Sequence, residues 1–451
     1  MSIITLQLGQ CGNQVGGQFF STIVDDIFAK STGVGSTENK DYVDCSLDTF
    51  FTQSQHMSSR DGSLESPKAR AVLVDMETKA ITQTMQLAKK SGKWAYPDRW
   101  FSQKRGSGNN WAHGFCVHGP RSQEDIMNLV RKETEQCDRL GGFMNLLSLA
   151  GGTGSGVGAF VTESLRDEYP QSFILNQVVW PYNTGEVIVQ NYNAILTLSH
   201  IYDTADALVV MENDALHKIC GQLLGIKNIS FRDINKVIAH KLASVLQPSL
   251  STDTAGTVPC DLGFLLEKLT SHPQHKLLTV KNIPQMSDTS WEFSTYNWPS
   301  LVKNLRQMLI ADAAMEEGIN WDVKPASRTA SGNTCFNRSL STMLILRGQE
   351  VSTVDAAMFS DPSIYSSWMP AEMISSIARQ PRMFCNYEKT AALVSNSCAS
   401  VRPLNHIMDK AWNMFSSRAY VHQYLRHGLT EEDFLDSFVS LEKIIASYNH
   451  L

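Results

Sequence analysis

The segment Ala150-Gly-Gly-Thr-Gly-Ser-Gly-Val-Gly158 constrains this chain more than any other, because five of its nine residues are glycine. It follows the apolar run 143–150 and opens a helical pattern at 157–168. A backbone without a Cβ can approach a phosphate closely, and the free amides at a helix N-terminus favour an anion. Thr153 and Ser155 add hydroxyl donors. The segment therefore predicts a phosphate-binding turn between a strand and a helix.

A glycine cluster by itself is also compatible with a plain tight turn, so the segment has to be compared with the known phosphate-binding motifs. The segment is not a P-loop, because no Gly-Lys-Ser/Thr follows the glycines. Residues 154–159 fit the looser pattern G-x-G-x-x-A, which expects a carboxylate about 20 residues further on, at the end of the next strand. The run 173–180 contains no carboxylate. This disfavours an NAD-dependent dehydrogenase.

Strand-like and helix-like runs alternate through the first half of the chain. Helical patterns such as 126–137 and 157–168 lie between short apolar runs, which cover 3–8, 71–74, 143–150, 173–180 and 207–211. Such alternation predicts an α/β fold, a parallel sheet with helices on both faces. Ligands bind at the carboxyl ends of the strands in such sheets, and polar or glycine-rich segments follow each of these runs.

The chain divides into three predicted parts. We expect a nucleotide-binding domain over 1–212, a core helix with a second α/β domain over 213–395, and a C-terminal helical segment over 396–451. The core helix is predicted at 232–246, where apolar residues recur with the spacing of one buried helical face. The turn-rich stretch 247–259 then interrupts that pattern.

Other segments complete this division. Residues 31–68, rich in Ser, Thr, Gly and Asp, predict a long surface loop with little regular structure. The second domain combines a helix at 298–311 with strand-like runs at 276–280, 342–347 and 391–394. In the C-terminal segment, Thr430-Glu-Glu-Asp433 predicts a capping box that opens the last helix.

Composition excludes several classes of function. The net charge is −6 and the pI about 6.1, whereas nucleic-acid binders usually carry a basic domain or stripe. No apolar run approaches the roughly 20 residues that span a bilayer, and the first residues lack the basic region of a signal peptide. The nine cysteines are scattered without a C-x-x-C pair. We therefore expect a soluble intracellular protein with reduced thiols that binds neither nucleic acid nor membrane.

Four motifs in order give the glycine segment its context. They are Gly9-Gln-Cys-Gly-Asn-Gln14, Val74-Asp-Met-Glu77, Gly106-Ser-Gly-Asn-Asn-Trp111 and Gly151-Gly-Thr-Gly-Ser-Gly156. In wording and spacing they resemble the tubulin family. The resemblance continues through Tyr192-Asn193, Glu212 to Ala215, Phe231 to Asn235 and Ala419 to Tyr424, and covers essentially the whole chain. It implies a Rossmann-like GTPase domain, a core helix, a second α/β domain and C-terminal helices.

The resemblance also implies which residues bind GTP or GDP with Mg²⁺. Gln10 and Cys11 would line the phosphates and the base. The residues that cradle the β- and α-phosphates would be Ser148, Gly151, Gly152, Thr153, Gly154 and Ser155. Gly108 and Asn109 would cap the γ-phosphate. Asp75 and Glu77 would hold Mg²⁺ through water, since hard carboxylate oxygens suit that ion. Taken singly, these residues would be ordinary turn residues or a buried thiol. Only their occurrence together, in this order along the chain, supports a GTP and Mg²⁺ site.

The same resemblance assigns the base and the ribose. Asn213 and Asn235 would read the guanine edge, because an amide offers both a donor and an acceptor. Phe231 stands where the family stacks an aromatic ring, usually tyrosine, on the base. Glu186 matches a residue that contacts the ribose.

One position departs from polymerising tubulins, in which a neighbouring subunit supplies an acid that positions water at the γ-phosphate. In the corresponding segment Asp261 matches a family aspartate, but Phe264 occupies the place of the catalytic acid. Phenylalanine cannot orient water, although Glu267 lies one helical turn away. Because phosphoryl transfer depends on such positioning, we expect GTP binding with at most weak hydrolysis.

Within the family the chain resembles the delta class most, through residues 180–193, 306–310 and 316–318. The chain also stops at Leu451 without the acidic tail of alpha- and beta-tubulins. This class implies other tubulins or centriolar proteins as partners. It also implies a place in the cytoplasm and cytoskeleton, at centrosomes, centrioles and the basal bodies of cilia or flagella. The alternative is a GTP-hydrolysing, polymerising subunit of microtubules.

Overall fold

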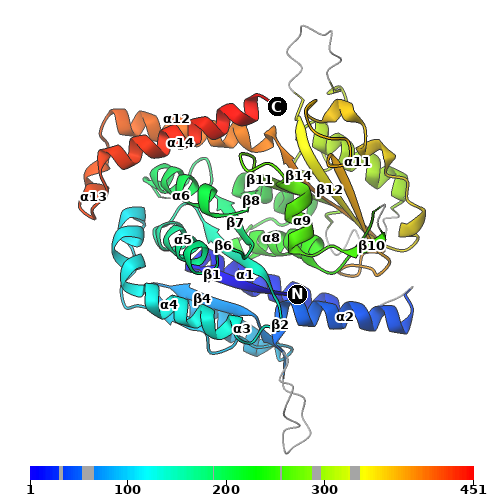
Figure 1. The fold of residues 1–451 in the computed structure, drawn as a ribbon, viewed down its shortest axis with the longest axis horizontal. Helices are drawn as coiled ribbons and strands as arrows, with labels where there is room; N and C mark the ends of the chain where they lie inside the picture. The colour runs from blue at the N-terminus through cyan, green and yellow to red at the C-terminus, as the bar shows by residue number, and fades with distance from the viewer. Residues whose placement is uncertain (30–33, 53–65, 186, 254–255, 287–295, 326–335) are drawn as a thin grey trace, which may run out of the picture.

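The computed structural model describes residues 1–29, 34–52, 66–185, 187–253, 256–286, 296–325 and 336–451. Within them one twelve-stranded sheet runs through the molecule in the order β10-β9-β13-β12-β14-β11-β8-β7-β6-β1-β4-β5, with helices on both sides (Figure 1). Its first-half strands are β1 (Ser2–Leu8), β4 (Ala71–Asp75), β5 (Trp100–Ser102), β6 (Leu140–Ser148), β7 (Ile174–Trp180) and β8 (Ala207–Glu212). These strands all pair in parallel, which confirms the predicted α/β class.

Both faces of the parallel sheet are covered, which explains why its strands read as nearly continuous apolar runs. All residues of β1 are buried. Ile4, Leu6 and Leu8 join one core cluster, whereas Ile3 joins the cluster on the other face. The covering helices are α1 (Gly9–Ile27), α3 (Thr78–Ser91), α4 (Gly119–Thr134), α5 (Gly158–Glu168), α6 (Gln190–Thr204), α7 (Asn213–Lys218) and α8 (Phe231–Leu246).

Helix α8 lies at the predicted position and packs against α1. Its apolar stripe from Ile234 to Val245 is buried, as the spacing predicted. The stretch after it does not remain irregular, because β9 (Leu250–Asp253) and β10 (Gly256–Pro259) pair antiparallel and extend the sheet. The predicted interruption of the helical pattern after residue 246 is confirmed, because α8 ends at Leu246, while the strands β9 and β10 were not predicted.

The predicted loop over 31–68 was wrong in part, and its residues 31–33 and 53–65 lie outside the described residues. Residues 36–50 form helix α2 (Ser36–Phe50), which is followed by the short pair β2 (Phe51–Thr52) and β3 (Lys68–Ala69). Tyr42, Ser46 and Phe50 are the buried residues of α2 and recur every four positions. This single buried stripe, set among polar residues, stabilises the helix through tertiary packing.

The second half of the sheet mixes strand directions. Its elements are α9 (Leu262–Leu269), β11 (Leu277–Ile283), α11 (Trp298–Ile310), β12 (Ser339–Gly348), β13 (Ser375–Gln380) and β14 (Lys389–Ser397). Strand β14 pairs antiparallel with β11 and β12, and β11 joins the first half by pairing in parallel with β8. The predicted strands of this half are confirmed, while β13 was not predicted.

The C-terminal helices α12 (Val401–Ser416), α13 (Val421–Leu425) and α14 (Glu431–Asn449) lie together, and α12 and α14 pack on α6 (Figure 1). The predicted capping box is confirmed, since Thr430 and Asp433 exchange both hydrogen bonds. Shorter helical turns are η1 (His113–His118), η2 (Thr153–Val157), η3 (Ile219–Leu223), η4 (Val351–Thr353), η5 (Ala357–Phe359), η6 (Pro362–Ile364) and η7 (Cys398–Ser400). Of the described helices, none combines the length and apolar character needed to cross a bilayer.

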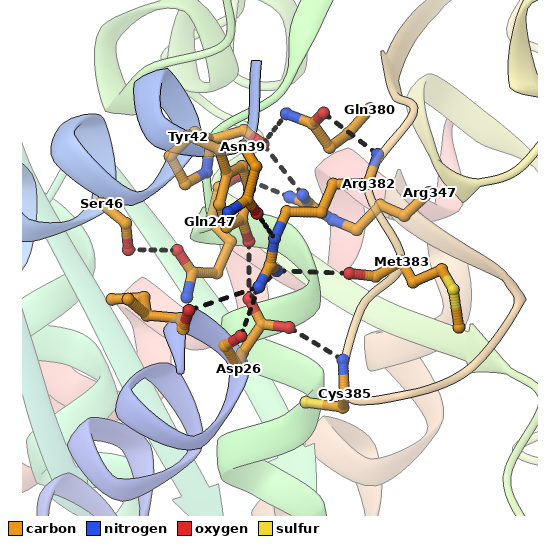
Figure 2. Close-up of polar contacts among 12 residues, drawn as sticks. Asp26, Asn39, Tyr42, Ser46, Gln247, Arg347, Gln380, Arg382, Met383 and Cys385 are labelled. Atoms are coloured by element: carbon orange, nitrogen blue, oxygen red, sulfur yellow. Dashed lines mark hydrogen bonds and ion pairs between the residues drawn. The ribbon is translucent and has the colours of Figure 1, made fainter. Parts of the chain in front are cut away.

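A buried polar network joins the N-terminal helices to the segment after β13 (Figure 2). Its centre is the ion pair between Arg382 Nη1 and Asp26 Oδ2, 3.0 Å apart, with side chains 2% and 0% exposed. Asn39 and Tyr42 of α2 contribute further hydrogen bonds to this pair. The network therefore fixes the ends of α1 and α2 against the second half of the chain.

Candidate nucleotide site

The carboxyl ends of five parallel strands form one edge of the sheet. Pairing register places Leu8 of β1 opposite Val74 of β4, and Trp180 of β7 opposite Glu212 of β8. Ser148 of β6 pairs in turn with β7. The turns that follow these strands therefore start at one level along this edge, where such sheets bind ligands.

The turn after β1 contacts the glycine loop. Gly9 has φ +72°, and a Cβ there would lie 2.7 Å from the backbone nitrogen of Gly154. A Cβ at Gly154 would in turn lie 3.4 Å from the hydroxyl of Ser148. The structure thus brings together the N-terminus of α1, which carries Gln10 and Cys11, the glycine loop and Ser148. Burial raises the pKa of the Cys11 thiol to about 12, so the thiol is neutral.

The turn 106–111 covers the glycine loop from another side. Ser107 and Thr153 hydrogen-bond through their hydroxyls, 3.0 Å apart, and a Cβ added to Gly152 would overlap the Ser107 hydroxyl. Gly108 and Asn109 both have positive φ, 62° and 55°. A left-handed asparagine is a sparsely populated conformation that its surroundings must enforce. The turn 106–111 and the glycine loop are therefore in direct contact.

Asp75 and Glu77 stand at the end of β4, beside the turn 106–111. Asp75 Oδ1 accepts a hydrogen bond from the Glu77 amide at 3.2 Å, while Oδ2 is buried without a hydrogen-bond partner. Burial raises the pKa of the Asp75 carboxyl to about 6. A Cβ on Gly106 would lie 2.5 Å from Glu77 Oε1. A buried carboxylate oxygen without a partner suits a hard cation such as Mg²⁺, which commonly binds one or two carboxylates with phosphates and water.

The residues predicted for the base lie further along the same edge. Asn213 begins α7 and is buried, and Asn235 is buried in α8, which packs against both α1 and α7. Phe231 opens α8, is 55% exposed and has its ring 6.4 Å from that of Tyr182. In the described part of the chain no hydrogen bond joins Asn213 or Asn235 to the Gly9 turn, the turn 106–111 or the glycine loop. Glu186 lies outside the described residues.

Sequence reasoning assigned no role to two amides that connect these turns. Asn13 Nδ2 donates to the carbonyls of Gly9, at 2.9 Å, and Val74, at 3.2 Å, and so connects the turns after β1 and β4. Asn193 of α6 donates to the carbonyl of Ala150 at the start of the glycine loop. Asn13 belongs to the first motif and Asn193 to the Tyr192-Asn193 pair. Membership of these motifs is the sequence feature from which a role for both residues could have been predicted.

Comparisons with known proteins agree with this geometry. A family model described as Tubulin/FtsZ family, GTPase domain matches residues 2–221, and such a domain binds guanine nucleotide. The chain is also similar over its full length to curated tubulins, and it therefore belongs to the tubulin family.

The particular relatives are delta chains. The chain is 50% identical to the tubulin delta chains of Mus musculus and Canis lupus familiaris and 49% identical to that of Homo sapiens, covering 100% of both chains in each case. It is 27% identical to the tubulin beta-4 chain of Zea mays, over 99% of this chain and 94% of that one. The resemblance to the delta class is therefore confirmed, and the protein is cytoskeletal.

Proposed function

We propose that this chain is a delta-type tubulin that acts at centrioles and basal bodies, where it supports triplet microtubules and the assembly of cilia or flagella. Bound GTP or GDP with Mg²⁺ serves chiefly as a structural cofactor and state marker. The observation that carries the proposal is the convergence of the Gly9 turn, the turn 106–111 and the glycine loop on one edge of the sheet. The full-length similarity to tubulin delta chains supports the cellular role.

The proposed phosphate site uses backbone amides more than charge. Gln10 and Cys11 line the phosphates and the base. The β- and α-phosphates lie against Ser148, Gly151, Gly152, Thr153, Gly154 and Ser155. Gly108 and Asn109 cap the γ-phosphate, which is why their left-handed backbone matters. Asp75 and Glu77 hold Mg²⁺, and the cation offsets the cost of burying the Asp75 carboxylate.

The proposed base site is formed by helices α7 and α8. The amides of Asn213 and Asn235 read the guanine edge, and the exposed ring of Phe231 stacks on the base. Phenylalanine offers the same stacking face as the family's tyrosine and lacks only its hydroxyl. Glu186 contacts the ribose.

The centriolar role has a direct test in cells. In ciliated cells that express a fluorescently tagged copy, we expect the tag to concentrate at centrioles and basal bodies, because the chain shares half its residues with tubulin delta chains. Super-resolution imaging beside a centriole marker measures this. A tagged alpha-tubulin is the control, and a tag spread along the whole microtubule network in the same way would contradict the proposed role.

GTP turnover separates the leading function from the polymerising alternative. Helix α9 carries Phe264 at the position of the catalytic acid, and Asp261 accepts a hydrogen bond from the Phe264 amide at 2.9 Å as the helix N-cap. Glu267 is exposed on the same helix. We expect phosphate release to stay slow and to rise only in proportion to protein concentration. Turnover per molecule that climbs steeply with concentration would instead support a polymerising GTPase.

A matched pair of variants tests the role of Phe264 directly. Phe264→Glu restores a carboxylate at the acid position, and we expect it to raise turnover per molecule at high concentration, because an acid can orient water at a neighbour's phosphate. Glu267→Gln is the control, since it removes the nearby carboxylate that could substitute. A fall in turnover with Glu267→Gln would show that Glu267 acts in place of the missing acid.

A further inference from the structure

The side-chain amide of Asn193 is fully buried and has all its hydrogen-bonding groups engaged. Its Nδ2 donates to the carbonyls of Asn109 and Ala150, both at 2.8 Å. Its Oδ1 accepts from the Trp111 amide at 3.0 Å and from the Tyr424 hydroxyl at 2.6 Å. Because backbone amides only donate and carbonyls only accept, these partners fix the orientation of the amide.

Three of these four partners, Asn109, Trp111 and Ala150, belong to the two turns at the γ-phosphate end of the proposed site. Asn109 lies in the turn 106–111, in a left-handed conformation, and Ala150 begins the glycine loop. One amide group therefore sets the spacing between the two turns. Because the Asn193 amide is buried, the loss of any of its hydrogen-bond partners would cost free energy.

The fourth partner comes from the C-terminal segment, more than two hundred residues away. Tyr424 lies in α13 and is fully buried. The same segment touches the turn 106–111 and its neighbour twice more. Asn110 Nδ2 donates to the Gln423 carbonyl at 3.1 Å, and the rings of His113 and His427 stack with centroids 4.4 Å apart. Helix α13 thus lies directly behind the turn that caps the phosphate.

We propose that Asn193 and Tyr424 are positioning residues that couple the docking of the C-terminal segment to the grip on the γ-phosphate. The Tyr424 hydroxyl holds the Asn193 amide, which in turn holds the turn 106–111 at the distance that GTP requires. Coupling of this kind is reciprocal, so a partner that binds the docked C-terminal helices raises the affinity for GTP relative to GDP. The inference rests on the proposed nucleotide site.

Three substitutions test the coupling. Tyr424→Phe removes only the hydroxyl that reaches Asn193 and keeps the ring. Asn193→Asp replaces the donor of two hydrogen bonds by an oxygen that faces two carbonyl oxygens, so the turns must separate. The control is Tyr192→Phe, which removes a buried hydroxyl from the same helix. That hydroxyl donates to the Ala419 carbonyl of the C-terminal segment at 3.0 Å, whereas the Tyr424 hydroxyl donates to Asn193. The control therefore also loses a contact with the C-terminal segment but keeps the hydrogen bond from Tyr424 to Asn193.

The experiment measures affinities of the full-length protein for GTP and GDP by competition with a fluorescent GTP analogue. For Tyr424→Phe we expect GTP affinity to fall about three- to tenfold, as for one lost buried hydrogen bond, and GDP affinity to change less. Asn193→Asp should give a larger fall. Tyr192→Phe should leave the ratio of GTP to GDP affinity as in wild type.

Two outcomes would count against different claims. Suppose that the wild-type protein binds GTP, and that Tyr424→Phe and Tyr192→Phe have the same ratio of GTP affinity to GDP affinity. That result would overturn the coupling. Wild type that binds neither nucleotide would overturn the proposed function, and the coupling with it. Thermal unfolding of each variant identifies any that fails to fold, and Tyr424→Phe, which changes one atom, is sufficient for the decision if Asn193→Asp does not fold.

Discussion

Asp26→Ala should lower the free energy of unfolding by about 3–5 kcal/mol, the usual cost of removing one partner of a buried ion pair. The Arg382 side chain is 2% exposed and would keep its charge without a counter-ion. Among the described residues, Asp26 is the one carboxylate that forms an ion pair with Arg382. Its removal should therefore cost far more free energy than the loss of a surface ion pair. The loss should therefore be among the largest for a single substitution in this chain.

The network in Figure 2 shows how many groups depend on this carboxylate. Asp26 Oδ2 accepts from Arg382 Nη1 at 3.0 Å and from the Tyr42 hydroxyl at 2.8 Å. Its Oδ1 accepts from the Cys385 amide at 2.8 Å. Arg382 Nε also donates to the Asn39 side chain at 2.9 Å. Alanine at position 26 would leave three donors, from helix α2 and from the segment after β13, without this acceptor.

Urea denaturation followed by circular dichroism measures the loss, and the neighbouring residue supplies the control. Asp25 pairs with Lys93 at 2.6 Å, but both side chains are more than half exposed. Asp25→Ala should therefore cost less than about 1 kcal/mol, as surface pairs do. Adding Arg382→Met to Asp26→Ala should recover part of the loss. Equal destabilisation by Asp25→Ala and Asp26→Ala would contradict the importance of the buried pair.

Gly152→Val should abolish retention of guanine nucleotide, with a loss of affinity on the order of 100-fold. A Cβ at this position would overlap the Ser107 hydroxyl and lie 2.7 Å from the backbone nitrogen of Asn110. The backbone cannot yield as a flexible side chain would, so the turn 106–111 must move away from the glycine loop. The proposed γ-phosphate cap then no longer meets the rest of the site.

Nucleotide and metal extracted from the purified protein provide the measurement. Wild type should carry guanine nucleotide together with Mg²⁺, and Gly152→Val should carry neither. Gly221→Val is the matched control, because a Cβ there meets only the Ile229 side chain at an ordinary 3.5 Å. Wild type that retains no guanine nucleotide, or a Gly152→Val protein that retains as much as Gly221→Val, would refute the proposed site.

The chemistry of individual residues was sufficient to predict much of the fold. Apolar runs ending in polar turns predicted the parallel strands, because strands buried on both faces must be apolar throughout. The glycines from 151 to 158 predicted a turn before a helix, and Thr430 with Asp433 predicted the start of α14. These features depend on neighbours within a few positions, so local sequence carries them.

Other features depend on partners that are distant in the chain. The stripe of Tyr42, Ser46 and Phe50 becomes helix α2 only because the rest of the fold covers it. Asp26 meets Arg382 across 356 positions, and nothing near either residue indicates the other.

The sequence by itself therefore determined the class of fold, the order of the proposed phosphate-binding turns and the family. Only the tertiary structure decided which buried polar groups pair and how Asn193 joins two turns to Tyr424 of the C-terminal segment. The physical reason is that a buried donor or acceptor must find its partner inside the protein, and that partner can come from any part of the chain.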